Sequence, residues 1–508
     1  MFQTIIGTIS SFMYSKLLVI LLIGAGVYFT IRTRFPQVRL FKNACGSVME
    51  KPEDKGAISS FQALMVSTAS RVGTGNIVGV SSAICIGGFG SVFWMWVIAI
   101  IGSASALIES TLAQIYKKKG KDGSCYGGPA YYIEAALHCR PLAIVFCVAM
   151  ILTYAFGFNM LASYNLQSTF SVFSFYDAKM SPWIIGGILA VLTGWCLLGG
   201  GSRIVKVTSM VVPVMGIAYI GISLLVVIIN IQNVPAMFVR IFEEAFDFKA
   251  IFGAFAGSAM MQGIRRGLYS NEAGIGSAPN ASASAQVSHP IKQGLVQMLS
   301  VFIDTLLLCT ATAMMCLSSG IAPAQELQGA PWVQAALHES LGNFGPLFIT
   351  VAMVLFAFTT LLGNCFYCDN LLNYIHKGQP SKTFMKGFRI VSALVVFIGA
   401  GMEVSMLWNI SDVLMGVMAL INIPVILILS NTALKALGDY EKQKKNGENP
   451  VFRDTKVHIG ADEFYGNSEE YRAYTDEMLK YIRDEKGRTP RVWGSLSNKR
   501  GNTPVTAE

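Results

Sequence analysis

The chain has 508 residues, of which 53% are hydrophobic and 14% charged, and its mean hydropathy is +0.51. A set of soluble domains of this length would carry far more charge, so the composition excludes that class and indicates an integral membrane protein. Residues 436–508 carry 13 acidic and 13 basic side chains, so the formal excess of +9 belongs to residues 1–435. Such an excess orients membrane loops, and no nucleic-acid partner is expected.

Eleven hydrophobic stretches are long enough to cross a hydrocarbon core of about 30 Å. The first is interpreted as an uncleaved helix, because Arg32 and Arg34 follow it and no small-residue cleavage site is visible. The sequence therefore predicts an all-α integral membrane protein with eleven transmembrane helices. The stretches lie near residues 16–33, 59–88, 89–116, 141–166, 182–200, 203–230, 250–270, 290–319, 343–375, 386–402 and 404–435.

The loops between these stretches alternate in charge. If the N-terminus is outside, five cytoplasmic loops hold 20 Lys and Arg residues, whereas the opposite side holds only four. This bias predicts a multi-pass protein of the cell membrane, within a lipid bilayer, with its N-terminus outside and its C-terminus in the cytoplasm. The five loops run over residues 32–55, 117–140, 203–206, 265–292 and 377–389.

The helices after the first form two sets of five, which suggests an internal repeat. Because five is an odd number, the second set is inverted relative to the first, a layout typical of secondary transporters whose opening helices are broken near the midplane. Three regions are expected: an N-terminal helix with a cytoplasmic linker (1–56), a ten-helix core (57–435), and a polar cytoplasmic tail (436–508). The two repeats of the core cover residues 57–230 and 250–435.

The segment STASRVGTGNIVG, residues 67–79, places Arg71, two glycines and Asn76 where a spanning helix should be apolar. A helical glycine costs about 1 kcal/mol relative to alanine, and unpaired backbone groups in lipid cost several kcal/mol each. The segment therefore suits the lining of a wet cavity, where free amides bind a carboxylate and free carbonyls coordinate a hard cation. A close-packed glycine contact between helices explains the glycines but not Arg71 or Asn76.

The second set opens with GAFAGSAMMQG, residues 253–263. Its small residues and Gln262 predict a second interruption that faces the first. Acidic residues inside other spans are costly and usually face a partner or a cavity. For Glu109, Asp304, Asp369 and Asp412 we expect pairing inside the helix bundle rather than proton transfer.

Five strings together, STASRVGTGNIVGV, FWMW, YGGPAYYIE, RRGLYSNEAGIGSAPNA and FIDT, resemble the alanine/glycine:cation symporter family, also called sodium:alanine symporters. The resemblance runs from about residue 55 to 435. It implies a fold like the leucine transporter, with broken first and sixth core helices. It also implies alternating-access import of a small neutral amino acid, alanine or glycine, coupled to sodium.

The resemblance also implies roles for particular residues. The substrate-binding candidates are Gly73, Thr74, Gly75 and Asn76 for the carboxylate, Gly257, Ser258 and Gln262 for the amino group, and Asn364 in the pocket wall. The sodium candidates are the carbonyls of Ala69 and Val72 and the hydroxyls of Thr359 and Thr360. Arg71, Asp304 and Glu272 are candidates for a gate or a buried charge pair.

No catalytic residue is expected, because the H-E-x-x-H, G-x-S-x-G and P-loop motifs are missing from the sequence. No cofactor is expected besides sodium as the coupling ion. Two alternatives stay open at this point: proton coupling through Asp304 or another buried acid, and an amino-acid transceptor that signals through the C-terminal tail. The choice among alanine, glycine, serine and glutamine, and the oligomeric state, also stay open.

Overall fold

The computed structural model describes residues 2–50, 52, 57–119, 124–247 and 258–452. Within these residues, nine helices are long and apolar enough to cross a membrane. They match nine of the eleven predicted stretches, and the largest differences are at the start of the first helix and at the end of the last. The nine are Gln3–Arg32, Gly90–Ile115, Arg140–Val172, Ser181–Leu198, Gly200–Ile229, Pro290–Ser318, Phe344–Ile375, Lys382–Ala400 and Val404–Ile428.

The other two predicted stretches form shorter helices. Residues 59–88 are divided into α5 (Ser60–Arg71), η2 (Gly75–Gly79) and α6 (Val80–Gly87). Helix α5 begins at a capping box, in which the Ser59 hydroxyl accepts from the Gln62 amide and the Gln62 side chain accepts from the Ser59 amide. In the second stretch, α15 (Ala259–Asn271) runs unbroken and is followed by α16 (Ala278–Ser282).

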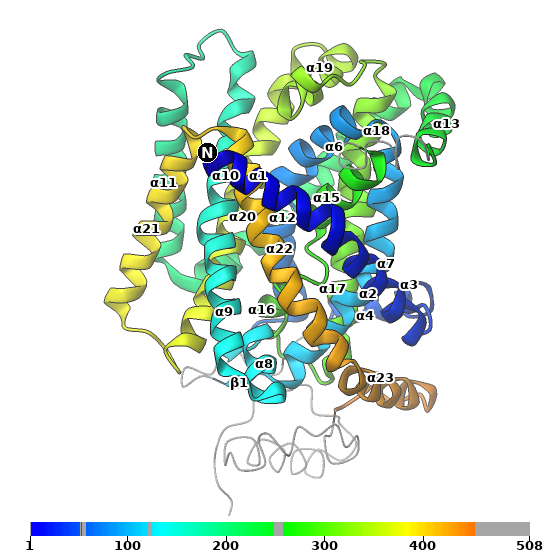
Figure 1. The fold of residues 1–508 in the computed structure, drawn as a ribbon, viewed down its shortest axis with the longest axis vertical. Helices are drawn as coiled ribbons and strands as arrows, with labels where there is room; N and C mark the ends of the chain where they lie inside the picture. The colour runs from blue at the N-terminus through cyan, green and yellow to red at the C-terminus, as the bar shows by residue number, and fades with distance from the viewer. Residues whose placement is uncertain (1, 51, 53–56, 120–123, 248–257, 453–508) are drawn as a thin grey trace, which may run out of the picture.

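Figure 1 shows the arrangement of the helices. Elements α8, β1 and α23 lie at its lower end, α3 and α4 lie below its middle on the right, and α13 and α19 lie in its upper part. The N-terminal elements are α1 (Phe2–Phe12), η1 (Met13–Leu18), α2 (Val19–Arg32), α3 (Pro36–Arg39) and α4 (Phe41–Val48). The first half continues with α7 (Gly90–Ile115), β1 (Lys118–Lys119), β2 (Cys125–Tyr126), α8 (Pro129–Leu137), α9 (Arg140–Ile151), η3 (Leu152–Gly157), α10 (Phe158–Ser168), η4 (Thr169–Val172), α11 (Ser181–Leu198), α12 (Gly200–Ile229), η5 (Ile231–Asn233) and α13 (Val234–Ala245). The second half continues with α17 (Pro290–Val301), η7 (Phe302–Cys309), α18 (Thr310–Ser318), η8 (Gln325–Leu327), α19 (Ala330–Leu341), α20 (Phe344–Ile375), α21 (Lys382–Ala400), α22 (Val404–Ile428) and α23 (Ser430–Lys445).

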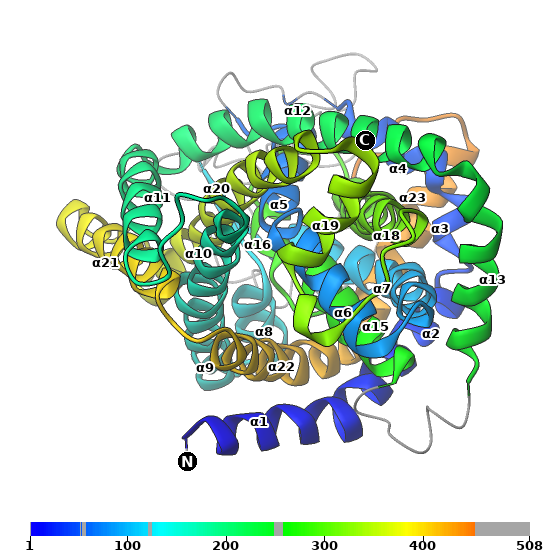
Figure 2. The same ribbon diagram turned by 90° about the horizontal axis from the view of Figure 1, so that it is seen from above.

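The helices differ in how much of their surface other helices cover. Seen from above, α5, α6 and α16 lie near the centre, and α11, α12, α13 and α21 lie at the periphery (Figure 2). Accordingly, 67% of the most apolar part of α7 and of α20 is buried, against 28% for α12 and 33% for α11 and α21. The peripheral helices keep an exposed apolar surface, which a bilayer would cover.

Glycines bring two groups of helices into backbone contact. A Cβ atom on Gly399 of α21 would lie 2.3 Å from the Met160 Cα atom of α10, and one on Gly186 of α11 would lie 2.5 Å from the Ala400 Cβ atom. A Cβ atom on Gly263 of α15 would lie 2.4 Å from the Ser91 carbonyl oxygen of α7. Glycine is required at these positions, so α10, α11 and α21 form one tightly packed group and α7 and α15 form another.

The chain also contains a little sheet structure. Strands β1 and β2 pair antiparallel, with Lys118 opposite Tyr126. Ile58, just before α5, forms an isolated parallel bridge with Ala285. The Gln286 amide donates to the Ile58 carbonyl oxygen at 3.0 Å, so the start of α5 is tied to the segment between α16 and α17.

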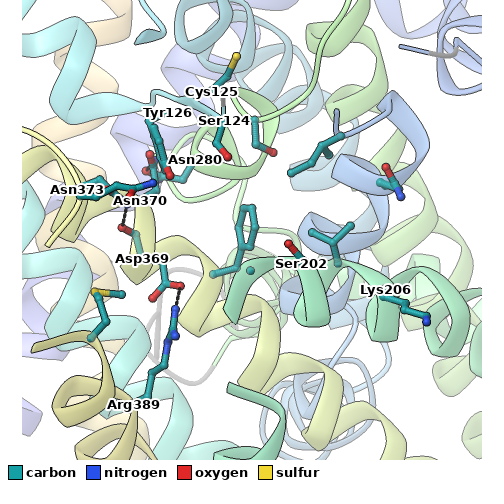
Figure 3. A pocket seen from close by; sticks show the side chains of 18 of the residues that line it. Ser124, Cys125, Tyr126, Ser202, Lys206, Asn280, Asp369, Asn370, Asn373 and Arg389 are labelled. Carbon is teal, nitrogen blue, oxygen red and sulfur yellow. Dashed lines mark hydrogen bonds and ion pairs between the residues drawn. The ribbon is translucent and has the colours of Figure 1, made fainter. Parts of the chain in front are cut away.

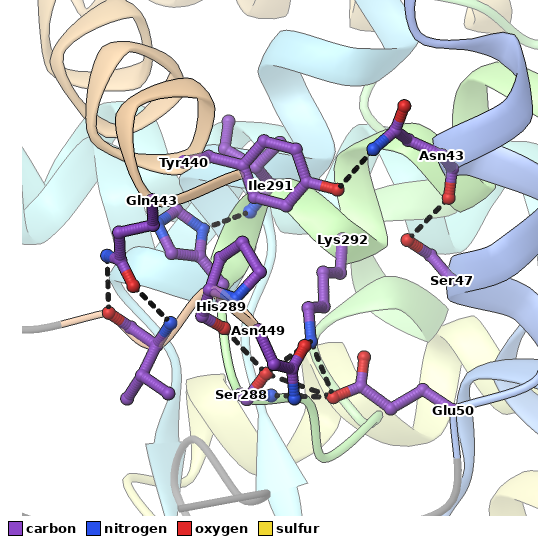
Figure 4. Close-up of polar contacts among 12 residues, drawn as sticks. Asn43, Ser47, Glu50, Ser288, His289, Ile291, Lys292, Tyr440, Gln443 and Asn449 are labelled. Carbon is purple, nitrogen blue, oxygen red and sulfur yellow. Dashed lines mark hydrogen bonds and ion pairs between the residues drawn. The ribbon is translucent and has the colours of Figure 1, made fainter. Parts of the chain in front are cut away.

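The predicted boundary at residue 435 falls inside α23. This helix and residues 446–452, which together we name the C-terminal clasp, pack against α4 and the start of α17 (Figure 4). The Lys292 ammonium donates to Glu50 at 3.0 Å and to Asn449 at 2.8 Å. The Phe452 amide donates to the Ser288 carbonyl oxygen at 2.9 Å. The predicted tail from residue 453 onward lies outside the described residues.

Candidate functional site

The first interruption, residues 72–74, separates α5 from η2. Val72 leaves the helical conformation, with φ −75° and ψ 84°. The Gly73 amide donates to Asn76 Oδ1 at 2.9 Å, and the Asn76 amide donates to the Gly73 carbonyl oxygen at 3.2 Å. Asn76 therefore closes the loop in which the helix is unwound. The amides of Thr74 and Gly75 stand at the start of the next helix, where N–H groups have no partner within the helix.

The side-chain amide of Asn76 is also bound to Asp304, a residue 228 positions away. It donates to Asp304 Oδ1 at 2.8 Å and to the Asp304 carbonyl oxygen at 3.2 Å. The hydroxyls of Ser270 and Thr305 each donate to Asp304 Oδ2 at 2.8 Å. The structure thus brings together two residues chosen from the sequence. Since both ends of Asn76 are occupied, it supports the first interruption rather than offering a free hydrogen bond.

The two predicted sodium-binding threonines differ in their surroundings. A Cβ atom on Gly73 would lie 2.1 Å from Thr360 Oγ1, so this hydroxyl lies directly against the first interruption. Thr360 Oγ1 is buried and has no hydrogen-bond partner among the described residues. By contrast, Thr359 Oγ1 donates to the Leu355 carbonyl oxygen at 2.9 Å and lies 3.7 Å from the Met215 sulfur of α12.

The second interruption, residues 272–277, separates α15 from α16. Glu272 adopts a left-handed conformation with φ 54°, and Gly274 and Gly276 have φ 85° and 90°. The Glu109 carboxylate accepts from the amides of Gly274 and Gly276 at 3.2 and 3.1 Å, and from Asn422 Nδ2 at 2.9 Å. An acid on α7 therefore satisfies backbone donors that the unwinding leaves free.

The interruption predicted within residues 253–263 is only partly covered by the described residues. Residues 253–257 lie outside them, Ser258 caps the start of α15 and accepts from the Met261 amide, and Gln262 lies inside this helix. Gln262 packs against Gly87, at the far end of α6, which is roughly 16 Å along the helix from Asn76. The structure thus does not bring Ser258 or Gln262 to the first interruption, and Gly257 lies outside the described residues.

Ser70 connects the two interruptions to α20. Its hydroxyl lies 2.7 Å from Asn364 Oδ1 and 3.4 Å from Glu272 Oε1. The Ser277 hydroxyl donates to Glu272 Oε2 at 2.7 Å, and Asn364 Nδ2 donates to Asn159 Oδ1 at 2.9 Å. Both ends of Asn364 are therefore occupied, and it links α5 to α10 through α20. Ala69, two residues before Arg71, is fully buried in the last turn of α5.

Arg71 is buried beside the first interruption, with 2% of its surface exposed. Its Nη1 atom donates to Gln297 Oε1 at 3.2 Å, whereas Nε and Nη2 have no hydrogen-bond partner within the described part of the chain. The expected pairing of Arg71 with an acid is not a direct contact there. Two other acids are paired as expected: Asp412 contacts Arg265 and Arg266, and Asp369 contacts Arg389.

Two residues at the first interruption were missed by the sequence analysis. The ring of Tyr269 would lie 2.7 Å from a Cβ atom on Gly75, and it packs against the rings of Phe158 and Trp408. Asn165 of α10 donates to the Thr74 hydroxyl at 3.0 Å. Tyr269 belongs to the string RRGLYSNEAG, which supports the family resemblance without singling out the tyrosine. Nothing in the local sequence indicates Asn165.

A cavity of about 1070 Å³ opens beside this region, between α12, α20, α21 and the segment before α5 (Figure 3). Asn370 on its wall donates to Asn280 Oδ1 at 2.6 Å. Asn280 Nδ2 in turn donates to the carbonyl oxygens of Gly276 and Ser277 at 3.1 and 2.9 Å. The inner end of the cavity thus meets the second interruption, and we name the cavity the vestibule.

Comparison with solved structures identifies the fold. The chain is similar to MhsT, solved in complex with L-phenylalanine, with a TM-score of 0.53 and 13% identity, over 82% of this chain and 96% of that one. At this level of identity the likeness concerns the fold alone. The fold is that of the leucine-transporter class, a helical membrane protein.

Comparison with known sequences identifies the family. The chain is 44% identical to the amino-acid carrier protein AlsT of Bacillus subtilis, over 90% of this chain and 96% of the relative. It is 41% identical to the probable sodium/glutamine symporter GlnT of the same organism, over 89% and 93%. It is 36% identical to the sodium/alanine symporter AgcS of Methanococcus maripaludis, over 88% and 98%. The profile of the sodium:alanine symporter family matches residues 1–454, and the chain therefore belongs to this family.

Proposed function

We propose that this chain imports alanine or glycine together with sodium, and that both ligands bind around the first interruption. Membership of the family makes the protein a sodium-coupled amino-acid symporter and not an enzyme. Relatives at similar identity are named for alanine and for glutamine, so the substrate itself is the open part of the proposal.

The observation that carries the proposal is the Thr360 hydroxyl, which is buried, unpaired among the described residues and in contact with Gly73. A buried hydroxyl without a partner costs about 1–3 kcal/mol, which a bound cation would recover. The carbonyls of Ala69 and Val72, at the end of α5, supply further neutral oxygens, which suit a hard ion. We assign the sodium site to these two carbonyls with Thr360, and with Thr359 on the preceding position.

The substrate carboxylate is assigned to the amides of Thr74 and Gly75, with Gly73 and Asn76 holding the loop in shape. Helix N-termini favour anions because their amides are free and their dipole is positive. For the ammonium group we propose the carbonyls of the second interruption, in place of Ser258 and Gln262. The ring of Tyr269 against Gly75 limits the space for a side chain, which supports a small amino acid.

For the whole chain we propose eleven membrane helices, a 5+5 inverted repeat and an outside N-terminus. The placement of α4 and α8 in the lower half of the molecule supports this orientation, because the two basic loops they belong to then share one side (Figure 1). Alternating access would follow from movement of the two repeats. A sodium ion that crosses 100 mV contributes about 2.3 kcal/mol, enough for roughly fifty-fold accumulation.

The test is uptake of labelled L-alanine into proteoliposomes with and without an inward sodium gradient, with competition by glycine, serine, glutamine and D-alanine. We expect accumulation above equilibrium that depends on sodium. This accumulation should be lost in Asn76→Ala and Thr360→Ala. Uptake driven by a pH gradient without sodium would instead support proton coupling through a buried acid such as Asp304. A chain that lacks residues 453–508 should keep its uptake. A transceptor that acts mainly through its tail would not require substantial uptake.

A further inference from the structure

We propose that the vestibule contains a second amino-acid site, in which Asp369 binds the ammonium group of a zwitterion and Arg389 binds its carboxylate. The identity of the ligand rests on the proposed function, because the amino acid that leaves the first interruption is the one that reaches the vestibule. The experiment below separates a failure of this site from a failure of the proposed function.

The vestibule is large enough for such a ligand. Its volume of about 1070 Å³ is at the upper end of the range of small-molecule sites. Its lining comes from elements distant in the sequence: Ser202, Lys206 and Ser209 on α12, Asp369, Asn370 and Asn373 on α20, and Arg389 on α21. Figure 3 shows Asp369 and Arg389 joined on one wall, with Asn370, Asn373 and Asn280 next to them.

The charge pair on this wall is only partly used. Arg389 Nη2 lies 2.7 Å from Asp369 Oδ2, and the two side chains keep 14% and 17% of their surface exposed. The contact leaves Asp369 Oδ1 and Arg389 Nη1 for a ligand. An amino acid carries an ammonium and a carboxylate one carbon apart, so it can lie antiparallel along the pair and make a charge-assisted hydrogen bond to each partner.

The same wall holds more hydrogen-bonding capacity than its own contacts use. Among the described residues, Arg389 Nε, Asn370 Oδ1 and Asn373 Oδ1 on this wall, and Ser209 Oγ on α12, are buried without a hydrogen-bond partner. Asn370 itself is 4% exposed. Unpaired buried groups are costly, and several of them on one cavity wall indicate a polar ligand. An ion pair whose only role is to hold α20 and α21 together needs no unpaired polar groups around it.

The charges around the pair favour a zwitterion over a simple ion. Lys206, Lys382 and Lys386 line the same vestibule, so among its described lining residues four basic side chains face one acid. This field repels a released sodium ion. An inorganic anion would satisfy the bases but would leave Asp369 Oδ1 without a ligand donor, whereas a zwitterion contacts both members of the pair.

The position of the site gives it a role in release. Asn370 follows Asp369 directly and donates to Asn280, which holds the second interruption through Gly276 and Ser277. An amino acid bound at Asp369 and Arg389 therefore lies next to the contacts that join the vestibule wall to the second interruption. Amino acid that accumulates on the vestibule side would occupy this site and slow further unloading.

The test uses the full chain with Ser202→Cys as a probe in the vestibule, and with the accessible cysteines Cys45 and Cys139 and the vestibule-lining Cys125 replaced by serine. The rate at which a soluble maleimide labels Cys at position 202 is measured in sodium-free choline buffer with increasing L-alanine. Because no sodium ligand belongs to the vestibule site, alanine should slow the labelling without sodium. This protection should be lost in Arg389→Gln and in Asp369→Asn, and retained in Arg389→Lys.

Arg140→Gln is the matched control. Arg140 also forms a two-residue ion pair, with Glu134 at 3.4 Å, but neither residue lines the vestibule. Alanine should protect Cys at position 202 in the Arg140→Gln variant as well as it does in the parent chain. Methylamine and propionate, which carry one charge each, should protect less than alanine. Equal protection by propionate alone would overturn the zwitterion and indicate an anion site.

The outcomes separate the two proposals. If alanine gives no protection in choline while sodium-driven uptake is intact, the vestibule site is wrong and the proposed function stands. If protection is present but sodium drives no uptake of any neutral amino acid, the vestibule site stands and the proposed substrate or ion is wrong. Protection that persists in both Arg389→Gln and Asp369→Asn would overturn the assignment to this pair.

Discussion

Thr359 and Thr360 are adjacent on α20, but their hydroxyl groups differ in hydrogen bonding. Thr359 bonds back to the Leu355 carbonyl oxygen of its own helix, which is the usual arrangement for a threonine in a membrane helix. Thr360 has no such partner among the described residues and touches Gly73. A sequence pattern cannot separate the two, because the distinction depends on which face of α20 meets α5.

This difference predicts unequal effects on sodium dependence. We expect Thr360→Val to raise the sodium concentration for half-maximal uptake by roughly tenfold, since a contact to a charged group contributes about 1.5–3 kcal/mol and 1.4 kcal/mol corresponds to a factor of ten. Thr359→Val should shift it far less. The measurement is alanine uptake against sodium concentration, and equal shifts in the two variants would show that the back-bond of Thr359 to Leu355 does not reduce its contribution to the sodium site.

The contact between Gly73 and Thr360 makes a second prediction. Gly73→Ala should abolish uptake, because the added Cβ atom would lie 2.1 Å from the Thr360 hydroxyl oxygen. Gly24→Ala, where a Cβ atom would meet nothing within 4 Å, is the control, and it should retain uptake with a stability gain of up to about 1 kcal/mol. Uptake by both variants at the parent rate would show that the close contact at the first interruption is dispensable.

At the scale of elements, nine helices were located from hydropathy because a span must be a long apolar run. The first interruption was located because polar and glycine residues break such a run. The interruption predicted within residues 253–263 stays a prediction, because residues 253–257 lie outside the described residues, and the interruption at residues 272–277 was not predicted. Its actual cause is non-local: Glu109, 165 residues before Gly274, accepts the amides that the unwinding frees. Asn76 and Asp304 were both chosen from the sequence, but their contact depends on the same kind of long-range packing.

The C-terminal clasp gives a prediction about truncation. Val451 and Phe452 are buried, with 2% and 0% of their surface exposed, and Gln443 exchanges two hydrogen bonds of 2.9 Å with the backbone of Val451. Removing residues 453–508 should leave the melting temperature of the purified chain nearly unchanged, whereas removing residues 446–508 should lower it. Phe452→Ala in the chain that ends at residue 452 should cost about 3–5 kcal/mol. Identical melting of the two truncated chains would show that the clasp adds no stability.

Burial also makes the clasp sensitive to acid. Burial lowers the pKa of His289 below its ordinary value of 6.5, and Lys292 acts in the same direction while Asp439 on α23 opposes it. The unfolded chain therefore binds this proton more readily than the folded chain. The stability linked to His289 is present above about pH 6.5 and is lost as the pH falls below it.

The measurement compares melting temperatures at about pH 7.5 and pH 5.5. His289→Asn keeps an acceptor for the Ile291 amide, which donates to His289 Nδ1 at 3.2 Å, but it does not titrate. We expect a smaller loss of melting temperature at the lower pH in this variant than in the parent. An unchanged loss would assign the acid sensitivity to other groups.

At the scale of the molecule, the proposed orientation is testable with one native cysteine. Cys45 is exposed and lies in the linker expected in the cytoplasm. In intact cells, with Cys139 replaced by serine, a membrane-impermeant maleimide should not label Cys45 until the membrane is permeabilised. A cysteine at exposed Lys179 should be labelled without permeabilisation. The reverse pattern would invert the topology derived from the loop charges.

The two tightly packed groups of helices have an energetic consequence. Within α10, α11 and α21, and within α7 and α15, glycines hold backbones in contact, so neither group deforms easily. Near the interruptions, three described side-chain hydrogen bonds join α5, the first interruption and α16 to α10 and α20. They link Ser70 with Asn364, Thr74 with Asn165, and Asn280 with Asn370. At about 0.5–1.5 kcal/mol each, these bonds together contribute only a few kcal/mol. If breaking these bonds is the main cost of a second arrangement, the binding energy of one ion and one small amino acid is of the right size to make that arrangement the more stable one.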